Sequence, residues 1–113
     1  EDIRLMESIL INENFNVIKA YNGDDGIELT IKEKPDLIIL DLMMPGKNGF
    51  DVVKAIRENS EIEKIPIIIS TIKEITSKDR EQLNSKVKSI IQKGEDAKEH
   101  ILQAIRDIER FKK

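Results

Sequence analysis

Hydrophobic positions along the chain follow two kinds of spacing, and each kind predicts a different secondary structure. In five segments apolar residues recur every three or four positions, which is the spacing of amphipathic helices. The helices predicted in this way cover residues 2–13, 24–33, 50–58, 77–84 and a last segment that begins at residue 95. Short apolar runs lie between these segments and predict strands. The predicted strands cover residues 16–20, 37–41, 67–71 and 87–91.

The order of these elements predicts the fold class. Turn residues, such as Asn22-Gly23 and the proline and glycines within 42–49, fall between the periodic segments. The runs at 37–40 and 67–69 contain no polar alternation, which is typical of parallel strands buried on both faces. Strands that alternate with helices predict right-handed βαβ units. We therefore expect an α/β fold with a doubly wound parallel sheet and helices on both of its faces.

Composition limits the classes of protein to which the chain can belong. Its 113 residues suffice for one domain, and a formal net charge of −3 offers no broad cationic face to nucleic acid. The absence of cysteine excludes zinc–thiolate sites and thiol catalysis, and the single histidine, His100, excludes multi-histidine metal sites. Neither a membrane-spanning run nor a signal peptide is visible, so a cytoplasmic location without membrane contact is expected.

Three polar residues stand at the ends of predicted strands, where the sites of parallel sheets form. Asp41, Thr71 and Lys93 each follow an apolar run, and adjacent strands would bring them together. A carboxylate, a hydroxyl and an ammonium at one edge suit phosphoryl transfer, with the carboxylate as nucleophile. Each residue also has a structural explanation, because Asp41 can cap a turn, Thr71 can be a satisfied strand-end hydroxyl, and Lys93 can be a solvated surface lysine.

The motifs around these positions carry a resemblance to a known family. Pro35-Asp-Leu-Ile-Ile-Leu-Asp41, followed by Leu-Met-Met-Pro-Gly-Lys-Asn-Gly, resembles the phosphoacceptor strand and loop of CheY-like response-regulator receiver domains. Ile65-Pro-Ile-Ile-Ile-Ser-Thr71 resembles the family's strand with its switch hydroxyl, and Ile90-Ile-Gln-Lys93 resembles the strand with its active-site lysine. The stretch over residues 75–94 is similar to receivers attached to hybrid sensor kinases.

This resemblance implies a single receiver domain over residues 1–113, with the flavodoxin-like fold, in a two-component phosphorelay. Asp41 would take a phosphoryl group from the phosphohistidine of a histidine kinase or a histidine phosphotransfer protein. Thr71 and Lys93 would bind the phosphoryl oxygens. Mg²⁺ would lie between Asp41, the backbone carbonyl of Met43 and an acidic pair that follows the family's first strand. The resemblance implies a signalling module that is not an enzyme and does not itself bind nucleic acid.

The chain also departs from the family's pattern. The family's first strand, central in the sheet, and its acidic pair are expected upstream of residue 1, so the domain is expected to be amino-terminally incomplete. Magnesium binding is then expected to be weak or absent. The open strand edges are expected to produce a homodimer, strand exchange, or a closed-up sheet. Ile72 replaces a small residue and would crowd the phosphoryl site, and Ile90 replaces a switch tyrosine or phenylalanine.

Three alternatives to a working receiver remain open. A degenerate receiver that never carries phosphate and acts as a protein-interaction module is favoured by the missing acids, Ile72 and Ile90. The intact Asp41, Thr71 and Lys93 oppose it. A phosphatase with an aspartate nucleophile needs a second acid two residues later, where this chain has Met43. Nucleotide hydrolysis lacks a glycine-rich loop that ends in Gly-Lys-Ser/Thr.

Overall fold

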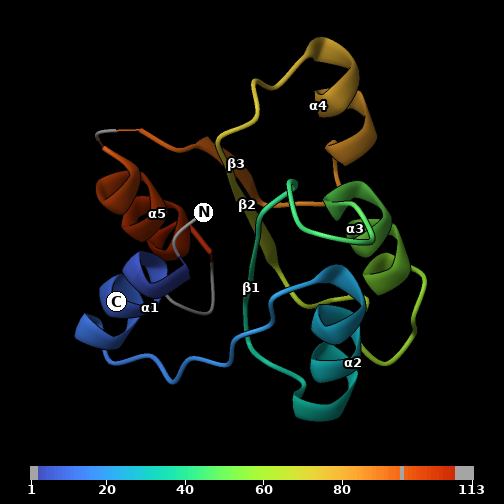
Figure 1. Cartoon of the computed structure of the whole chain (residues 1–113), viewed down its shortest axis with the longest axis horizontal. Helices are drawn as coiled ribbons and strands as arrows, with labels where there is room; N and C mark the ends of the chain where they lie inside the picture. Colours follow the sequence, from blue (N-terminus) through green and yellow to red (C-terminus); the bar gives the residue numbers. More distant parts are fainter. Residues whose placement is uncertain (1–2, 95, 109–113) are drawn as a thin grey trace.

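The computed structural model describes residues 3–94 and 96–108. This part of the chain contains five helices and three strands, joined by loops (Figure 1). The strands are β1 (Ile38–Leu40), β2 (Ile67–Thr71) and β3 (Ser89–Gln92). The helices are α1 (Ile3–Asn12), α2 (Gly23–Glu33), α3 (Gly49–Arg57), α4 (Ser77–Leu83) and α5 (Ala97–Arg106). Residues 2 and 95, at which the first and last predicted helices begin, lie outside the described residues.

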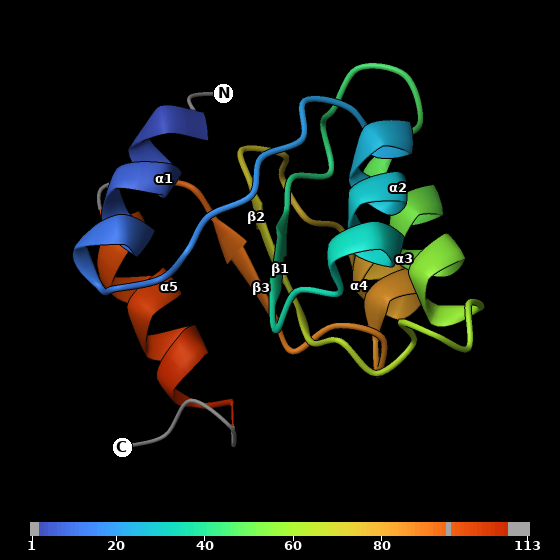
Figure 2. The same ribbon diagram turned by 90° about the horizontal axis from the view of Figure 1, so that it is seen from below.

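The strands form one parallel sheet in the order β1-β2-β3, so β2 is central. Ile39 of β1 pairs with Ile68, and Ile69 of β2 pairs with Ile90 of β3. Figure 2 shows three layers, with α1 and α5 on one face of the sheet and α2, α3 and α4 on the other. This arrangement is the flavodoxin-like α/β fold, and it confirms the predicted fold class.

Apolar side chains build a separate core on each face of the sheet. Because side chains alternate along a strand, Ile67 and Ile69 of β2 pack with α3 and Leu83, whereas Ile68 packs with α5. All three isoleucines are fully buried. The unbroken apolar run in β2 is therefore explained by helices that cover both of its faces.

Arg57, at the end of α3, holds the segments that lead into two of the strands. Its guanidinium donates hydrogen bonds to the backbone carbonyls of Glu63 at 2.7 Å, Ile65 at 2.8 Å and Lys86 at 2.8 Å. Burial lowers the pKa of this guanidinium from its usual value. Since these carbonyls precede β2 and β3, the contacts hold the chain just before it enters both strands.

The strand predicted over residues 16–20 is wrong. The segment forms no backbone hydrogen bonds to a strand within the described residues, and it runs as an irregular connection from α1 to α2 across the edge of the sheet (Figure 2). Both of its ends are held by helices, because Phe15 N–H donates to the last turn of α1 at 3.1 Å and Asn22 caps α2. Lys19 also pairs with Glu7 of α1 at 3.1 Å. These contacts hold the segment away from β1, so the closed-up sheet does not form.

A cavity of about 580 Å³ lies between this segment and β1. Its walls include apolar side chains from both faces of the sheet, among them Leu10, Val17 and Val52. Ile38 N–H donates to Pro66 O on the side of β2. In a parallel ladder the N–H and C=O of the next residue, Ile39, then point the other way. Among the described residues no strand pairs with this edge of β1, and the open edge faces an apolar space.

The buried hydroxyl of Ser70 predicts that its removal stabilises the fold. Ser70 is 2% exposed, and its Oγ has no hydrogen-bond partner among the described residues. Thr30 is similarly buried, but its hydroxyl donates to Gly26 O at 2.7 Å. We expect Ser70→Ala to raise the free energy of unfolding by about 1 kcal/mol, and Thr30→Val to lower it by about 1 kcal/mol. Urea denaturation measures both, and a loss of stability in Ser70→Ala would contradict this assignment.

The open edge of β1 predicts self-association by strand exchange, because unpaired strand edges recruit further strands. We expect a dimer whose fraction rises with protein concentration in light scattering after gel filtration. Ile18, 52% exposed in the segment beside this edge, is the residue to change: Ile18→Lys should shift dimerisation to higher concentration. Ile11→Lys, at an equally exposed position on α1, is the control. A monomer at every concentration, or equal effects of the two variants, would refute pairing at the edge.

Candidate functional site

Asp41 follows β1 at the carboxyl edge of the sheet, at the base of the loop that leads to α3. Gly49 N–H donates to Leu42 O at 3.2 Å and closes this loop. A Cβ atom at position 49 would lie 2.5 Å from Leu42 Cα, so the approach requires glycine. Asn48 caps α3, with its side chain accepting a hydrogen bond from Asp51 N–H at 3.0 Å. The two ends of the loop are therefore fixed, and so is the position of Asp41.

The carboxylate of Asp41 is surrounded by donors. The Thr71 hydroxyl and the Met43 N–H each donate to Oδ1 at 2.9 Å. The Lys93 ammonium lies 3.6 Å from Oδ2. The Asp41 side chain retains 16% of its exposure, so it is mostly enclosed but still reached by solvent. One oxygen of the carboxylate is thus oriented by two hydrogen bonds, and the other faces a cation.

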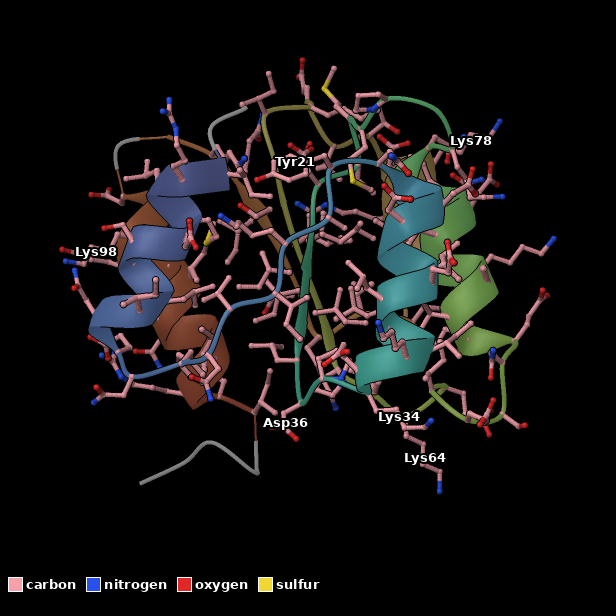
Figure 3. The ribbon with its side chains drawn as sticks, turned by 60° about the horizontal axis from the view of Figure 1, so that its bottom comes forward. Tyr21, Lys34, Asp36, Lys64, Lys78 and Lys98 are labelled. Carbon is pink, nitrogen blue, oxygen red and sulfur yellow. The ribbon has the colours of Figure 1, made fainter. Side chains whose placement is uncertain are left out.

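Sheet register brings the three predicted site residues together. β1, β2 and β3 are adjacent, so residues just beyond their carboxyl ends share one edge of the sheet. Lys93 N–H also donates to Thr71 O at 2.7 Å, which locks the ends of β2 and β3 to each other. Figure 3 shows Asp36 at the opposite end of β1, far from this edge. The predicted convergence of Asp41, Thr71 and Lys93 therefore matches the geometry.

Two further residues, Lys73 and Asp79, extend this polar cluster, and no pattern in the sequence had marked them as part of the site. Lys73 N–H donates to Thr71 Oγ1 at 3.2 Å, and Lys73 Nζ lies 2.5 Å from Asp79 Oδ2. Asp79 also forms a capping box with Thr76 at the start of α4, as the predicted helix start indicates. The hydrogen bond from Lys73, with one from the Thr76 backbone, holds the pKa of Asp79 below its usual value.

Ile72 and Ile90, the two departures from the family's pattern, lie in different surroundings. Ile72 is 57% exposed just beyond the end of β2, and its expected crowding of a bound phosphoryl group stays a prediction. Ile90 packs, partly buried, against the core on the α3 face.

The described residues fit only part of a magnesium site. No three or more histidine, cysteine, aspartate or glutamate side chains gather into a metal-binding group in residues 3–94 and 96–108. Of the expected ligands, Asp41 and Met43 lie together here. Mg²⁺ keeps several waters and takes one or two carboxylates with phosphate oxygens. Asp41 and the Met43 carbonyl can supply such a minimal set, but they do not make a protein cage.

The chain matches both a family model and a curated protein of known sequence. The family model described as the response regulator receiver domain matches residues 2–106. Protein PilH of Pseudomonas aeruginosa is 39% identical over 69 residues, a match that covers 61% of this chain and 57% of PilH. The chain therefore aligns with little more than half of that curated relative.

Solved structures with low sequence identity share the fold. The amino-terminal domain of a response regulator receiver protein from Methanoculleus marisnigri superposes with a TM-score of 0.75 at 23% identity, covering 93% of this chain and 85% of that one. The phosphorylated cyanobacterial phytochrome response regulator RcpA superposes with a TM-score of 0.76 at 24% identity, covering 93% and 83%. At this level of identity, the two structures support the fold alone.

The Lys73–Asp79 contact predicts an acid-sensitive contribution to stability. The pKa of Asp79 is lower in the folded chain than in an unfolded one. Its stabilising effect is therefore complete above the unfolded pKa, near 4, and is lost as pH falls through the lower folded pKa. We expect Asp79→Asn to lower the free energy of unfolding at pH 7. We also expect that free energy to fall less steeply below about pH 4, the ordinary pKa of aspartate, in the variant than in the wild type. Denaturation at several pH values measures this, and an unchanged slope would contradict it.

Proposed function

The chain belongs to the response regulator receiver domain family, and we propose that it accepts a phosphoryl group on Asp41 from a phosphohistidine. The observation that carries this proposal is the meeting of a carboxylate, a hydroxyl and an ammonium at one sheet edge. Thr71 Oγ1 lies 2.9 Å from Asp41 Oδ1, and Lys93 Nζ lies 3.6 Å from Oδ2. Receiver domains act in two-component signalling and are in general signalling modules, not enzymes.

The proposed transfer exchanges one bond to phosphorus for another. A carboxylate oxygen of Asp41 forms a bond to phosphorus while the bond from phosphorus to the donor's imidazole nitrogen breaks. The electron pair returns to the imidazole, which takes up a proton from solvent. Lys93 offsets the negative charge that builds up as carboxylate and phosphoryl group approach each other. Thr71 can then donate to a phosphoryl oxygen, because the doubly charged phosphoryl group is a stronger acceptor than an esterified carboxyl.

Magnesium is a general feature of the family, and Asp41 with the Met43 carbonyl are the residues proposed to hold it in this chain. When bound, Mg²⁺ supplies positive charge that neutralises phosphoryl oxygens. The partial fit of these two residues is the reason that we propose weak binding.

Further proposals concern the phosphodonor, the type of receiver and the cellular location. We propose that the phosphodonor is a histidine kinase or a histidine phosphotransfer protein, and that residues 1–113 act as a single receiver of the type attached to hybrid sensor kinases. The resemblance of residues 75–94 to that subfamily supports this choice. None of the helices in the described ranges has the length and apolar character to cross a bilayer. We propose a cytoplasmic domain that binds neither membrane nor nucleic acid.

A degenerate receiver is the second candidate, and one observation favours it. The described residues form no metal-binding group of three or more histidine, cysteine, aspartate or glutamate side chains, and without strong magnesium binding phosphorylation is expected to be slow. Such a domain would act as an interaction module through its surface alone. The phosphorylation test below separates the two candidates.

Phosphorylation on Asp41 is the first expected outcome. Acetyl phosphate with Mg²⁺ should add one phosphoryl group to the full-length protein that carries this chain, as seen by intact mass. Asp41→Asn should abolish the addition, because it removes the nucleophilic oxygen. Asp36→Asn, at the opposite end of β1 (Figure 3), is the matched control and should still be phosphorylated. An unchanged mass of the wild-type protein would support the degenerate receiver.

Weak magnesium binding is the second expected outcome. We expect residues 1–113 to bind Mg²⁺ in the millimolar range or more weakly, since one carboxylate compensates poorly for the waters that Mg²⁺ must give up. Isothermal titration of the wild type and Asp41→Asn measures this. Tight, stoichiometric binding would show that further ligands complete the site, and binding unchanged in Asp41→Asn would place the metal elsewhere.

A further inference from the structure

A continuous set of polar contacts runs from Asp41 to the first turn of α4. The Thr71 hydroxyl donates to Asp41 Oδ1 and accepts a hydrogen bond from Lys73 N–H at 3.2 Å. The ammonium of the same Lys73 lies 2.5 Å from Asp79 Oδ2, and that oxygen accepts a hydrogen bond from Thr76 N–H at 3.1 Å. We infer that Lys73 is a positioning residue that couples the orientation of the Thr71 hydroxyl to the amino-terminal turn of α4.

Lys73 is suited to this role because it binds at both of its ends. Its backbone N–H bonds to Thr71, which touches Asp41, and its side chain bonds to Asp79 of α4. The Asp79 side chain is 13% exposed and the Lys73 side chain 35%. Screening by water is therefore weaker for this ion pair than for a pair on the open surface.

The loop between β2 and α4, which contains Lys73, also carries two isoleucines that lie in different surroundings. Ile72, next to Thr71, is 57% exposed and points away from the core. Ile75 packs, partly buried, against the core on the α3 face and so holds the loop to the protein. The capping box joins Asp79 and Thr76 through two hydrogen bonds, at 3.0 and 3.1 Å, so a pull on Asp79 moves the helix start as a unit.

The inference builds on the proposed function, because phosphorylation of Asp41 is the event that would draw the Thr71 hydroxyl from its present acceptor. As the hydroxyl turns, Lys73 N–H either follows it or loses its acceptor. In both cases the backbone at Lys73 shifts, and the ammonium bound to Asp79 carries that shift to α4. Without the ammonium, the rearrangement at Thr71 should stop within the loop.

A double-mutant cycle tests the coupling without phosphorylation. We would record backbone amide shifts of wild type, Thr71→Val, Lys73→Met and the double variant. Thr71→Val should shift the amides of residues 77–81 in the wild-type background, and at least threefold less in the Lys73→Met background. Lys73→Arg, which keeps a cation, should restore the larger shift. Lys78→Met removes a solvent-exposed lysine from the same turn and should leave the coupling unchanged.

Three results would overturn the inference: equal shifts with and without Lys73, no shift of α4 in any background, or the same loss in Lys78→Met. A merely structural role for Lys73 would lower stability in urea but leave the response of α4 to Thr71→Val intact. A second arm repeats the comparison with acetyl phosphate on full-length protein. If no phosphoryl group is added, the proposed function fails while the double-mutant cycle still decides the coupling.

Discussion

Thr71 is the residue on which the arrangement of the site depends. It ends the central strand, it is fully buried, and its carbonyl and hydroxyl bond to residues from three other segments. Its carbonyl accepts from Lys93 beyond β3, and its hydroxyl bonds to Asp41 beyond β1 and to the Lys73 backbone before α4. A buried hydroxyl must be satisfied, so the positions of these neighbours are not independent of one another. The order of the strands brings Asp41, Thr71 and Lys93 close together, and the hydrogen bonds of Thr71 orient its neighbours.

Most of the fold could be predicted from the sequence, because the spacing of apolar residues reflects the faces that helices and strands bury. The runs before Asp41 and Thr71 form strands because each pairs with a neighbouring strand and is covered by helices. The run before Thr71 lies between two strands, whereas the run before Asp41 pairs on one side, with β2. Residues 16–20 have similar local propensity but no partner strand in the described part of the chain, and a strand exists only where its backbone groups are paired. Local pattern could not reveal that α1 and α2 hold this segment across the sheet edge. Strand pairing depends on contacts between distant parts of the chain, so the strand predicted over residues 16–20 from local pattern alone was wrong.

The site divides in the same way into predictable and unpredictable parts. Asp41, Thr71 and Lys93 could be found because strand ends in parallel sheets meet at one edge, a rule that needs only the order of elements. Lys73 could not be assigned, because a lysine two residues after a strand has no local signal for its partner. Asp79 was recognisable only as a helix start. Their contact depends on the path of the loop between β2 and α4, which the sequence leaves open.

Ile90 limits how a structural change at Thr71 can be transmitted to the rest of the domain. A large aromatic side chain can swing between solvent and core, but isoleucine is β-branched, stiff about its first torsion and smaller. Ile90 is also packed against the core on the α3 face. A change at Thr71 must then travel through backbone and hydrogen bonds, and a ligand shifts the equilibrium only by its differential affinity for the two states. Hydrogen bonds break over a fraction of an ångström, so the response expected of this chain is a small displacement of α4 and not the exchange of a side chain between two pockets.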